Sequence, residues 1–164
     1  MSKHIALYAG SFDPVTRGHI DLMRRSLQFA DELVVAVAIN SKKVPLFSGD
    51  ERVAFIRDAV ADEPRIRVQA FDGLLVDFAR AVGASMLLRG LRAVSDFEYE
   101  FQMALMNRHL EPTLETIFMV PSLDTTYISS TMVREVARFG GDLTGLTAPS
   151  VITALRARFA QGDA

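Results

Sequence analysis

Residues 8–19, Tyr-Ala-Gly-Ser-Phe-Asp-Pro-Val-Thr-Arg-Gly-His, carry the residue types of a phosphate site. They join an apolar run at 5–9 to an amphipathic run that begins near Gly18. A strand, a polar turn and a helix in that order build phosphate sites in open α/β sheets, because backbone N–H groups and the helix dipole face the anion. Ser11 adds a hydroxyl in the turn, and His19 lies on the first turn of the helix. The segment predicts a site for a phosphate-bearing ligand.

The elements that must position this segment alternate along the chain. Apolar runs at 5–9 and 33–39 are typical of strands buried on both faces, and shorter candidates lie at 66–71, 85–89 and 116–120. Helix-period segments lie at 18–29, 50–62, 74–83, 95–110, 129–138 and 149–160. Ser48 with Glu51, and Ser95 with Glu98, have capping-box spacing. The alternation predicts one domain over 1–164 with an α/β, Rossmann-like fold: a doubly wound, five-stranded parallel sheet with flanking helices.

Composition excludes several classes of function. The chain has 164 residues, no cysteine and a formal net charge of −2. Disulfides, thiolate zinc sites and cysteine nucleophiles are therefore excluded, and a general nucleic-acid binder is disfavoured. The longest apolar run, at 33–39, is too short to span a bilayer, and the N-terminus lacks the apolar core of a signal peptide. We expect a cytoplasmic protein that binds neither nucleic acid nor membrane.

Ligands of such sheets bind beyond the carboxyl ends of the strands, so the residues that follow each strand are the candidates for the site. The segments that follow the strands contain cationic residues, residues with hydroxyl groups and glycines. They are Gly10 to Asp13, Asn40 to Lys43, Asp72 to Leu75, Arg89 to Arg92, and Pro121 and Ser122 with 125–131. Their convergence on one edge favours a small anionic ligand.

The same residues also have purely structural interpretations. His19 could cap a helix or be partly buried, and Lys42 with Lys43 could be a solvated pair. Ser129 or Ser130 is expected to cap a helix, which also presents N–H groups to an anion. Apolar side chains on one face of the 95–110 helix could pack into the core or form a subunit contact. They are Phe97, Phe101, Ala104 and Leu105.

The Thr-x-Gly-His spacing at 16–19 resembles the signature of the nucleotidyltransferase superfamily. Arg-Gly-Leu-Arg at 89–92, followed by Asp-Phe-Glu-Tyr-Glu at 96–100, narrows the resemblance to one family of that superfamily. With 10–14, 41–43, 106–109 and 128–131, the chain resembles the phosphopantetheine adenylyltransferases, bacterial enzymes of coenzyme A synthesis. The resemblance covers nearly the whole chain, in order and without a large insertion.

The resemblance implies transfer of the adenylyl group of ATP to 4′-phosphopantetheine with Mg²⁺, giving dephospho-coenzyme A and pyrophosphate. It implies catalytic roles for Ser11, His19, Lys43 and Arg92, with Lys43 preferred to Lys42, and no metal ligand from the protein. The implied ATP contacts are Ser11, Phe12, His19, Gly90, Leu91, Arg92, Glu100, Thr125, Thr126, Tyr127, Ile128, Ser129, Ser130 and Thr131. The implied contacts with the second substrate are Ser11, Lys43, Leu75, Arg89 and Asn107. A homohexamer, and coenzyme A as a candidate feedback inhibitor, are further implications.

Simple chemistry agrees with such a reaction. A phosphomonoester, with a second pKa of about 6, is already an anionic oxygen nucleophile near neutral pH. The protein need only orient two polyanions and offset their repulsion. The alternatives are another small-molecule nucleotidyltransferase, acting for example on nicotinamide mononucleotide or glycerol phosphate, and a non-catalytic nucleotide sensor. A class I aminoacyl-tRNA synthetase shares the Gly-His element, but this chain is too short for tRNA-binding domains.

Overall fold

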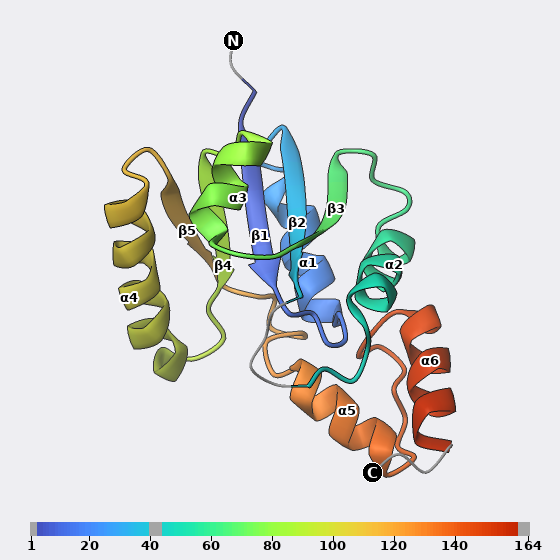
Figure 1. The fold of residues 1–164 in the computed structure, drawn as a ribbon. Helices are drawn as coiled ribbons and strands as arrows, with labels where there is room; N and C mark the ends of the chain where they lie inside the picture. The colour runs from blue at the N-terminus through green and yellow to red at the C-terminus, as the bar shows by residue number, and fades with distance from the viewer. Residues whose placement is uncertain (1–2, 40–43, 161–164) are drawn as a thin grey trace.

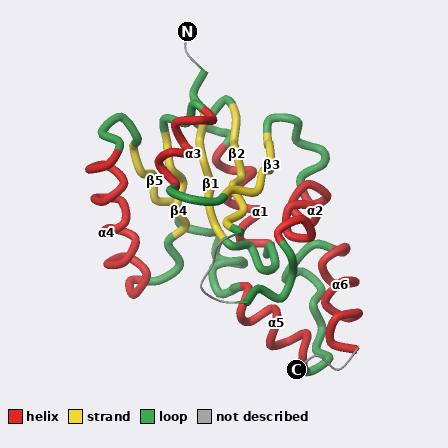
Figure 2. The backbone as a smooth tube through the Cα atoms, in the orientation of Figure 1, coloured by secondary structure: helices red, strands yellow, loops and turns green. Residues whose placement is uncertain are grey.

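The computed structural model describes residues 3–39 and 44–160 (Figures 1 and 2). Strands and helices alternate within these ranges. Their order is β1 (Ile5–Gly10), α1 (Arg17–Ser26), β2 (Glu32–Ala38), α2 (Gly49–Ala59), β3 (Ile66–Phe71), α3 (Leu75–Val82), β4 (Met86–Gly90), α4 (Val94–Leu110), β5 (Glu115–Met119), α5 (Ser130–Arg138) and α6 (Pro149–Ala160). The predicted strands and helices are all present, with ends that shift by up to three residues.

The five strands form one parallel sheet in the order β3-β2-β1-β4-β5. Chain order reverses at β1, which lies between β2 and β4, so the sheet is doubly wound as predicted. Apolar side chains cover both faces of β1. Leu7 packs with Val76 and Ala79 of α3 on one face, whereas Ala6 and Tyr8 belong to a larger core with α1, α2, α5 and α6. Figure 1 shows α3 in front of the sheet and α1 behind it.

Two predicted capping boxes have different outcomes. Ser48 and Glu51 form theirs at the start of α2, because each side chain accepts a hydrogen bond from the other's backbone N–H. The box at Ser95 and Glu98 is wrong. Helix α4 already begins at Val94, and its N-cap makes no side-chain hydrogen bond. The Asp96 carboxylate accepts from the N–H of Arg92, the residue just before the N-cap.

Helix α4 lies against one end of the sheet beside β5 (Figure 1). Of its 17 residues only Asn107 is buried. Phe97 and Phe101 stack on each other with ring centroids 5.6 Å apart, yet each is almost half exposed. The interpretation that this face packs into the core is therefore wrong, and the subunit contact stays a prediction. Among the described residues, no helix combines the length and the apolar character needed to cross a membrane.

Candidate active site

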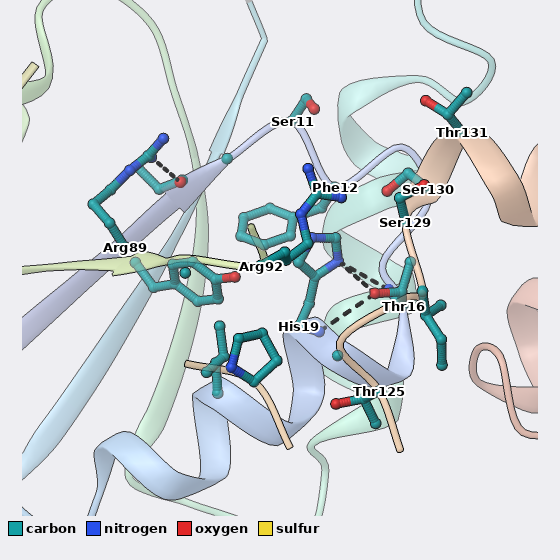
Figure 3. A pocket seen from close by; sticks show the side chains of 18 residues that line it. Ser11, Phe12, Thr16, His19, Arg89, Arg92, Thr125, Ser129, Ser130 and Thr131 are labelled. Carbon is teal, nitrogen blue, oxygen red and sulfur yellow. Dashed lines mark hydrogen bonds between the residues drawn. The ribbon is translucent and has the colours of Figure 1, made fainter. Parts of the chain in front are cut away.

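A cavity of about 360 Å³ opens at the carboxyl ends of β1 and β4 (Figure 3). Its walls come from the turn after β1, the start of α1, the end of β4 and the segment between β5 and α5. The lining residues are Tyr8, Ala9, Gly10, Ser11, Phe12, Thr16, Gly18, His19, Leu22, Arg89, Gly90, Arg92, Pro121, Thr125, Ile128, Ser129, Ser130 and Thr131. We call it the first cavity. It lies at the switch point of strand order, where open α/β sheets bind ligands.

The turn at residues 11–16, which we call the first turn, is fixed by side chains from distant segments. Its carbonyl groups accept hydrogen bonds from four of them. The pairs are Arg52 with Ser11, Arg134 with Asp13, Ser130 with Pro14 and Thr147 with Val15. The buried Asp13 carboxylate accepts in turn from the N–H groups of residues 46 and 47. The backbone that faces the first cavity is thus held from behind before any ligand binds.

Thr16 fixes the orientation and the proton position of His19. The Thr16 N–H donates to His19 Nδ1 at 3.0 Å, and the Thr16 hydroxyl lies 3.1 Å from the same nitrogen. The hydroxyl also accepts from the His19 N–H, so the pair closes a capping box at the start of α1. Because Nδ1 is an acceptor, the proton of the neutral ring is on Nε2. The proposed capping role of His19 is therefore present, and it leaves Nε2–H as a donor.

Burial, and to a lesser extent the nearby Arg92 cation, lower the pKa of His19 to about 4. The ring is therefore neutral near pH 7 in the ligand-free protein. The Phe12 ring packs edge-on against it, with centroids 5.0 Å apart, and Tyr8 packs in the same manner on Phe12. These contacts restrict the rotation of the imidazole.

Gly18 and Gly90 allow close packing around the first cavity. A Cβ atom at position 18 would lie 3.3 Å from the Thr125 carbonyl oxygen, and one at position 90 would lie 2.8 Å from Leu22. The sequence analysis had no signal for these partners, which come from other elements. Both glycines let α1 approach the neighbouring segments that line the cavity with it.

Arg89 connects the first cavity to a second one of about 230 Å³. Its guanidinium is held by two bonds to Glu100, of 2.6 and 2.8 Å, and by one to the Ala9 carbonyl at 3.0 Å. Glu100 in turn raises the pKa of Arg89. The second cavity is lined by Ala9, Gly10, Ser11, Ala38, Phe71, Leu75, Arg89, Tyr99, Glu100, Met103, Ala104, Asn107 and Thr116. The two cavities therefore meet at residues 9–11 and Arg89.

The structure divides the predicted site residues between the two cavities. Those on the first cavity alone are Phe12, His19, Gly90, Arg92, Thr125, Ile128, Ser129, Ser130 and Thr131. Those on the second alone are Leu75, Glu100 and Asn107, while Ser11 and Arg89 line both. Leu91, Thr126 and Tyr127 line neither cavity. Lys42 and Lys43 lie outside the described residues.

Several residues of the site were missed by the sequence analysis. Thr16 was noted only as part of a motif, although its spacing from His19 is that of a capping box with histidine in place of glutamate. Tyr8 was named in the 8–19 segment and Tyr99 in the 96–100 motif, but neither was given a role, and Met103 was not singled out. The signal for Tyr8 was its place at the end of the central strand. Tyr99 and Met103 lie four residues apart, so they share a helix face.

The described residues contain no cluster of three or more His, Asp or Glu side chains that could hold a metal ion. The one carboxylate of the first turn, Asp13, is already engaged by two backbone N–H groups. Mg²⁺ commonly binds through substrate phosphates with few protein ligands. The hydroxyl and cationic side chains that line the first cavity suit the phosphate groups that would carry such a cation.

Comparison with known proteins identifies the family. The cytidylyltransferase-like family matches residues 7–136. A phosphopantetheine adenylyltransferase of Thiobacillus denitrificans is 56% identical over 146 residues, which span 89% of this chain and 91% of the relative. One of Heliobacterium modesticaldum is 52% identical over 155 residues, spanning 94% and 92%. The chain belongs to the phosphopantetheine adenylyltransferase family.

A solved structure shows the same fold at lower identity. It is a putative nicotinate-nucleotide adenylyltransferase from Vibrio parahaemolyticus, 21% identical with a TM-score of 0.65 over 95% of this chain and 93% of that one. The predicted family and the Rossmann-like fold are thus confirmed. Membership makes the chain a nucleotidyltransferase, and two cavities that meet at one point suit an enzyme that joins two substrates.

Proposed function

We propose that the chain transfers the adenylyl group of ATP to 4′-phosphopantetheine, releasing pyrophosphate and dephospho-coenzyme A. The observation that carries this proposal is the junction of the two cavities at Ser11 and Arg89. One cavity is lined by hydroxyls, cations and a helix start, which suit a triphosphate. The other has apolar side chains, such as those of Phe71, Leu75 and Met103, and the buried amide of Asn107, which suit a pantetheine arm, next to the Arg89–Glu100 pair.

In the proposed step, a phosphate oxygen of phosphopantetheine attacks the α-phosphorus of ATP. A P–O bond forms, the bond from the α-phosphorus to the bridging oxygen breaks, and pyrophosphate leaves with the electron pair. His19 donates from Nε2 to a phosphate oxygen as charge shifts, while Ser11 and Arg92 bind the same anions. The neutral His19 tautomer, set by Thr16, provides this donor without proton transfer.

Arg89 is proposed to receive the phosphate of phosphopantetheine, since it lines both cavities and presents a fixed guanidinium. Glu100 supports this assignment because its carboxylate holds Arg89 from the second cavity. Leu75 and Asn107 would contact the pantetheine arm. The ATP contact predicted for Glu100 stays a prediction.

The nucleoside of ATP is assigned to the segment between β5 and α5. Thr125 and Ile128 to Thr131 line the first cavity there. Ser129 caps α5 by accepting from the Met132 N–H, so the positive end of this helix dipole adjoins the cavity. Leu91, Thr126, Tyr127 and Lys43 stay predicted ligands. Mg²⁺ is proposed to enter as the complex with ATP, offsetting phosphate charge.

Pyrophosphate release from ATP and Mg²⁺, measured with and without 4′-phosphopantetheine, tests the proposal. Release that requires phosphopantetheine, with dephospho-coenzyme A detected by mass spectrometry, would support both substrates. Reactions with nicotinamide mononucleotide or glycerol phosphate in its place test the other nucleotidyltransferases. ATP binding without turnover of any of these acceptors would contradict the proposal and favour a nucleotide sensor. Omission of Mg²⁺ is expected to abolish release.

A homohexamer, inhibition by coenzyme A and a cytoplasmic location are also proposed. The exposed Phe97 and Phe101 face of α4 supports self-association, since large apolar patches mark contact surfaces. The use of ATP as a substrate supports the proposed cytoplasmic location. Light scattering gives the mass of the particle, and pyrophosphate release at increasing coenzyme A tests inhibition. A monomeric particle would contradict the hexamer.

A further inference from the structure

Arg52 of α2 is a buried cation. It is 2% exposed and is among the largest fully buried side chains of the described residues. No Asp or Glu of residues 3–39 and 44–160 forms an ion pair with it within 4.0 Å. A guanidinium keeps its charge when buried, so this placement is costly unless its donors are well satisfied.

Two guanidinium nitrogens of Arg52, Nε and Nη1, donate to backbone carbonyl groups from three parts of the fold. Nε donates to the carbonyls of Phe47 at 3.1 Å and Ser48 at 3.3 Å, at the start of its own helix. Nη1 donates to the carbonyl of Ala38 at 2.9 Å, where β2 ends, and to that of Ser11 at 2.7 Å, in the first turn. The Arg52 guanidinium thus links the carboxyl ends of β1 and β2 to α2.

The bond to Ser11 sets the direction of the next peptide group. In a planar trans peptide the C=O and N–H groups point in opposite directions, and the Ser11–Phe12 peptide is trans. With the Ser11 oxygen drawn toward Arg52, the Phe12 N–H points the other way. No acceptor in the described part of the chain bonds to that N–H. Both residues line the first cavity.

Phe12 also has a backbone conformation that needs support. Its φ is +46°, in the left-handed region that non-glycine residues seldom adopt. Such strain persists only where surrounding contacts over-determine it, and it gathers at functional sites. The Arg52 bond on one side and the packing of the Phe12 ring on His19 on the other supply those contacts.

We propose that Arg52 is a positioning residue, which holds the Ser11–Phe12 peptide so that the Phe12 N–H donates to a phosphate group in the first cavity, next to its junction with the second. It touches no substrate itself. The inference rests on the proposed function, since the phosphate is that of ATP or of its acceptor. A preset N–H donor stabilises developing negative charge without reorganisation, so its loss should lower kcat more than it raises KM.

Arg57 provides a matched control on the same helix. It also donates to a strand carbonyl, that of Val68 at 2.9 Å, but in β3 and away from both cavities. Each Arg52 variant is compared with the matching Arg57 variant: Arg52→Gln with Arg57→Gln, and Arg52→Lys with Arg57→Lys. The comparison separates a positioning role in catalysis from a contribution to folding stability. Thermal unfolding is measured for all four variants. We expect Arg52→Gln to lose about 100-fold in kcat, the cost of one misdirected donor, with KM for ATP nearly unchanged.

A second readout does not depend on turnover. The ¹H–¹⁵N signal of Phe12 is followed as inorganic pyrophosphate is added to the full chain. The wild type and Arg57→Gln should show a downfield shift of this amide, and both Arg52 variants a much smaller one. If the wild type lacks turnover with phosphopantetheine, the proposed function fails while this shift still decides the role of Arg52.

Two results would overturn the inference. One is a kcat for folded Arg52→Gln no lower than that of Arg57→Gln. The other is an unchanged pyrophosphate response of the Phe12 amide in an Arg52 variant. If Arg52→Gln does not fold, Arg52→Lys against Arg57→Lys decides by the same criteria. Lysine keeps the charge but lacks the planar fork that reaches both strand ends.

Discussion

The first turn (residues 11–16) and helix α4 both border the junction of the two cavities. The first turn is held by many hydrogen bonds, whereas α4 has few buried contacts. Four carbonyl groups of residues 11–16 accept hydrogen bonds from side chains of α2, α5 and the segment before α6. Helix α4 buries only Asn107 of its 17 residues. It is joined to β4 by the pair of Glu100 with Arg89 and to β5 by that of Arg108 with Glu115.

This difference matches two kinds of task. Donors at a centre of developing charge are effective only when they are fixed beforehand. The first turn and His19 meet that condition through bonds that exist without ligand. A wall that receives a long flexible substrate gains from freedom to adjust, and segments with few buried contacts are the ones that open locally. We therefore propose that the first turn with His19, the fixed side of the junction, serves the chemistry, and that α4, the adjustable side, binds the acceptor.

The sharpest test of the fixed side is His19→Ala. We expect kcat to fall by about 100- to 1,000-fold, because one donor to developing charge is lost. KM for ATP should change far less, since the other donors of the first cavity remain. Steady-state kinetics at varied ATP measure both values, with the exposed His4→Ala as control. Equal loss of kcat and of ATP affinity would contradict a transition-state role.

Thr16→Val tests whether catalysis depends on the orientation of the His19 ring as well as on its Nε2–H donor. The variant keeps the shape of the side chain but removes the hydroxyl that caps α1. We expect a loss of about 1 kcal/mol in the free energy of unfolding. We also expect a loss of about tenfold in kcat, since a misplaced group can cost up to about 100-fold.

Urea unfolding and kinetics check the two effects of Thr16→Val. Thr16→Ser, which keeps the hydroxyl, should restore both. Unchanged kcat in a destabilised Thr16→Val would show that the threonine supports the helix alone.

Glu100→Gln tests the adjustable side. Without the carboxylate, the Arg89 guanidinium loses its part-buried ion pair, and the amide oxygen can replace only one of the two hydrogen bonds. We expect KM for phosphopantetheine to rise by up to about tenfold, with a smaller change in kcat. Glu111→Gln is the control, because it breaks the exposed pair with Arg80, and such pairs contribute little. A fall in kcat alone would place Glu100 with the fixed side instead.

The pH dependence of stability tests the buried environment of His19 without any substrate. Burial lowers the pKa of His19 from 6.5 to about 4, so the unfolded chain binds the proton more readily than the folded one. His19 therefore leaves stability unchanged above pH 6.5 and reduces it as pH falls from 6.5 toward 4. Urea unfolding of the ligand-free protein at several pH values should show this decline reduced in His19→Ala. An identical slope in wild type and variant would contradict the lowered pKa.

Sequence patterns predicted the edge of the sheet where the site lies. Apolar runs such as 5–9 and 33–39 specify buried strands by local periodicity, and parallel strands bring their carboxyl ends together. That reasoning placed Ser11, His19 and Arg89 at one edge, where the structure has them. The capping box expected at Ser95 was wrong because α4 begins at Val94, with Ala93 as its N-cap, two residues before Ser95.

The sequence by itself determined the fold, the family and the types of donor available to phosphate, since these depend on local periodicity and short motifs. Only the tertiary structure decided that Glu100 holds Arg89. It alone placed Arg52 behind Ser11, 41 residues away in sequence. Such contacts join segments whose separation in sequence carries no signal of their distance in space, because packing of the whole core brings them together.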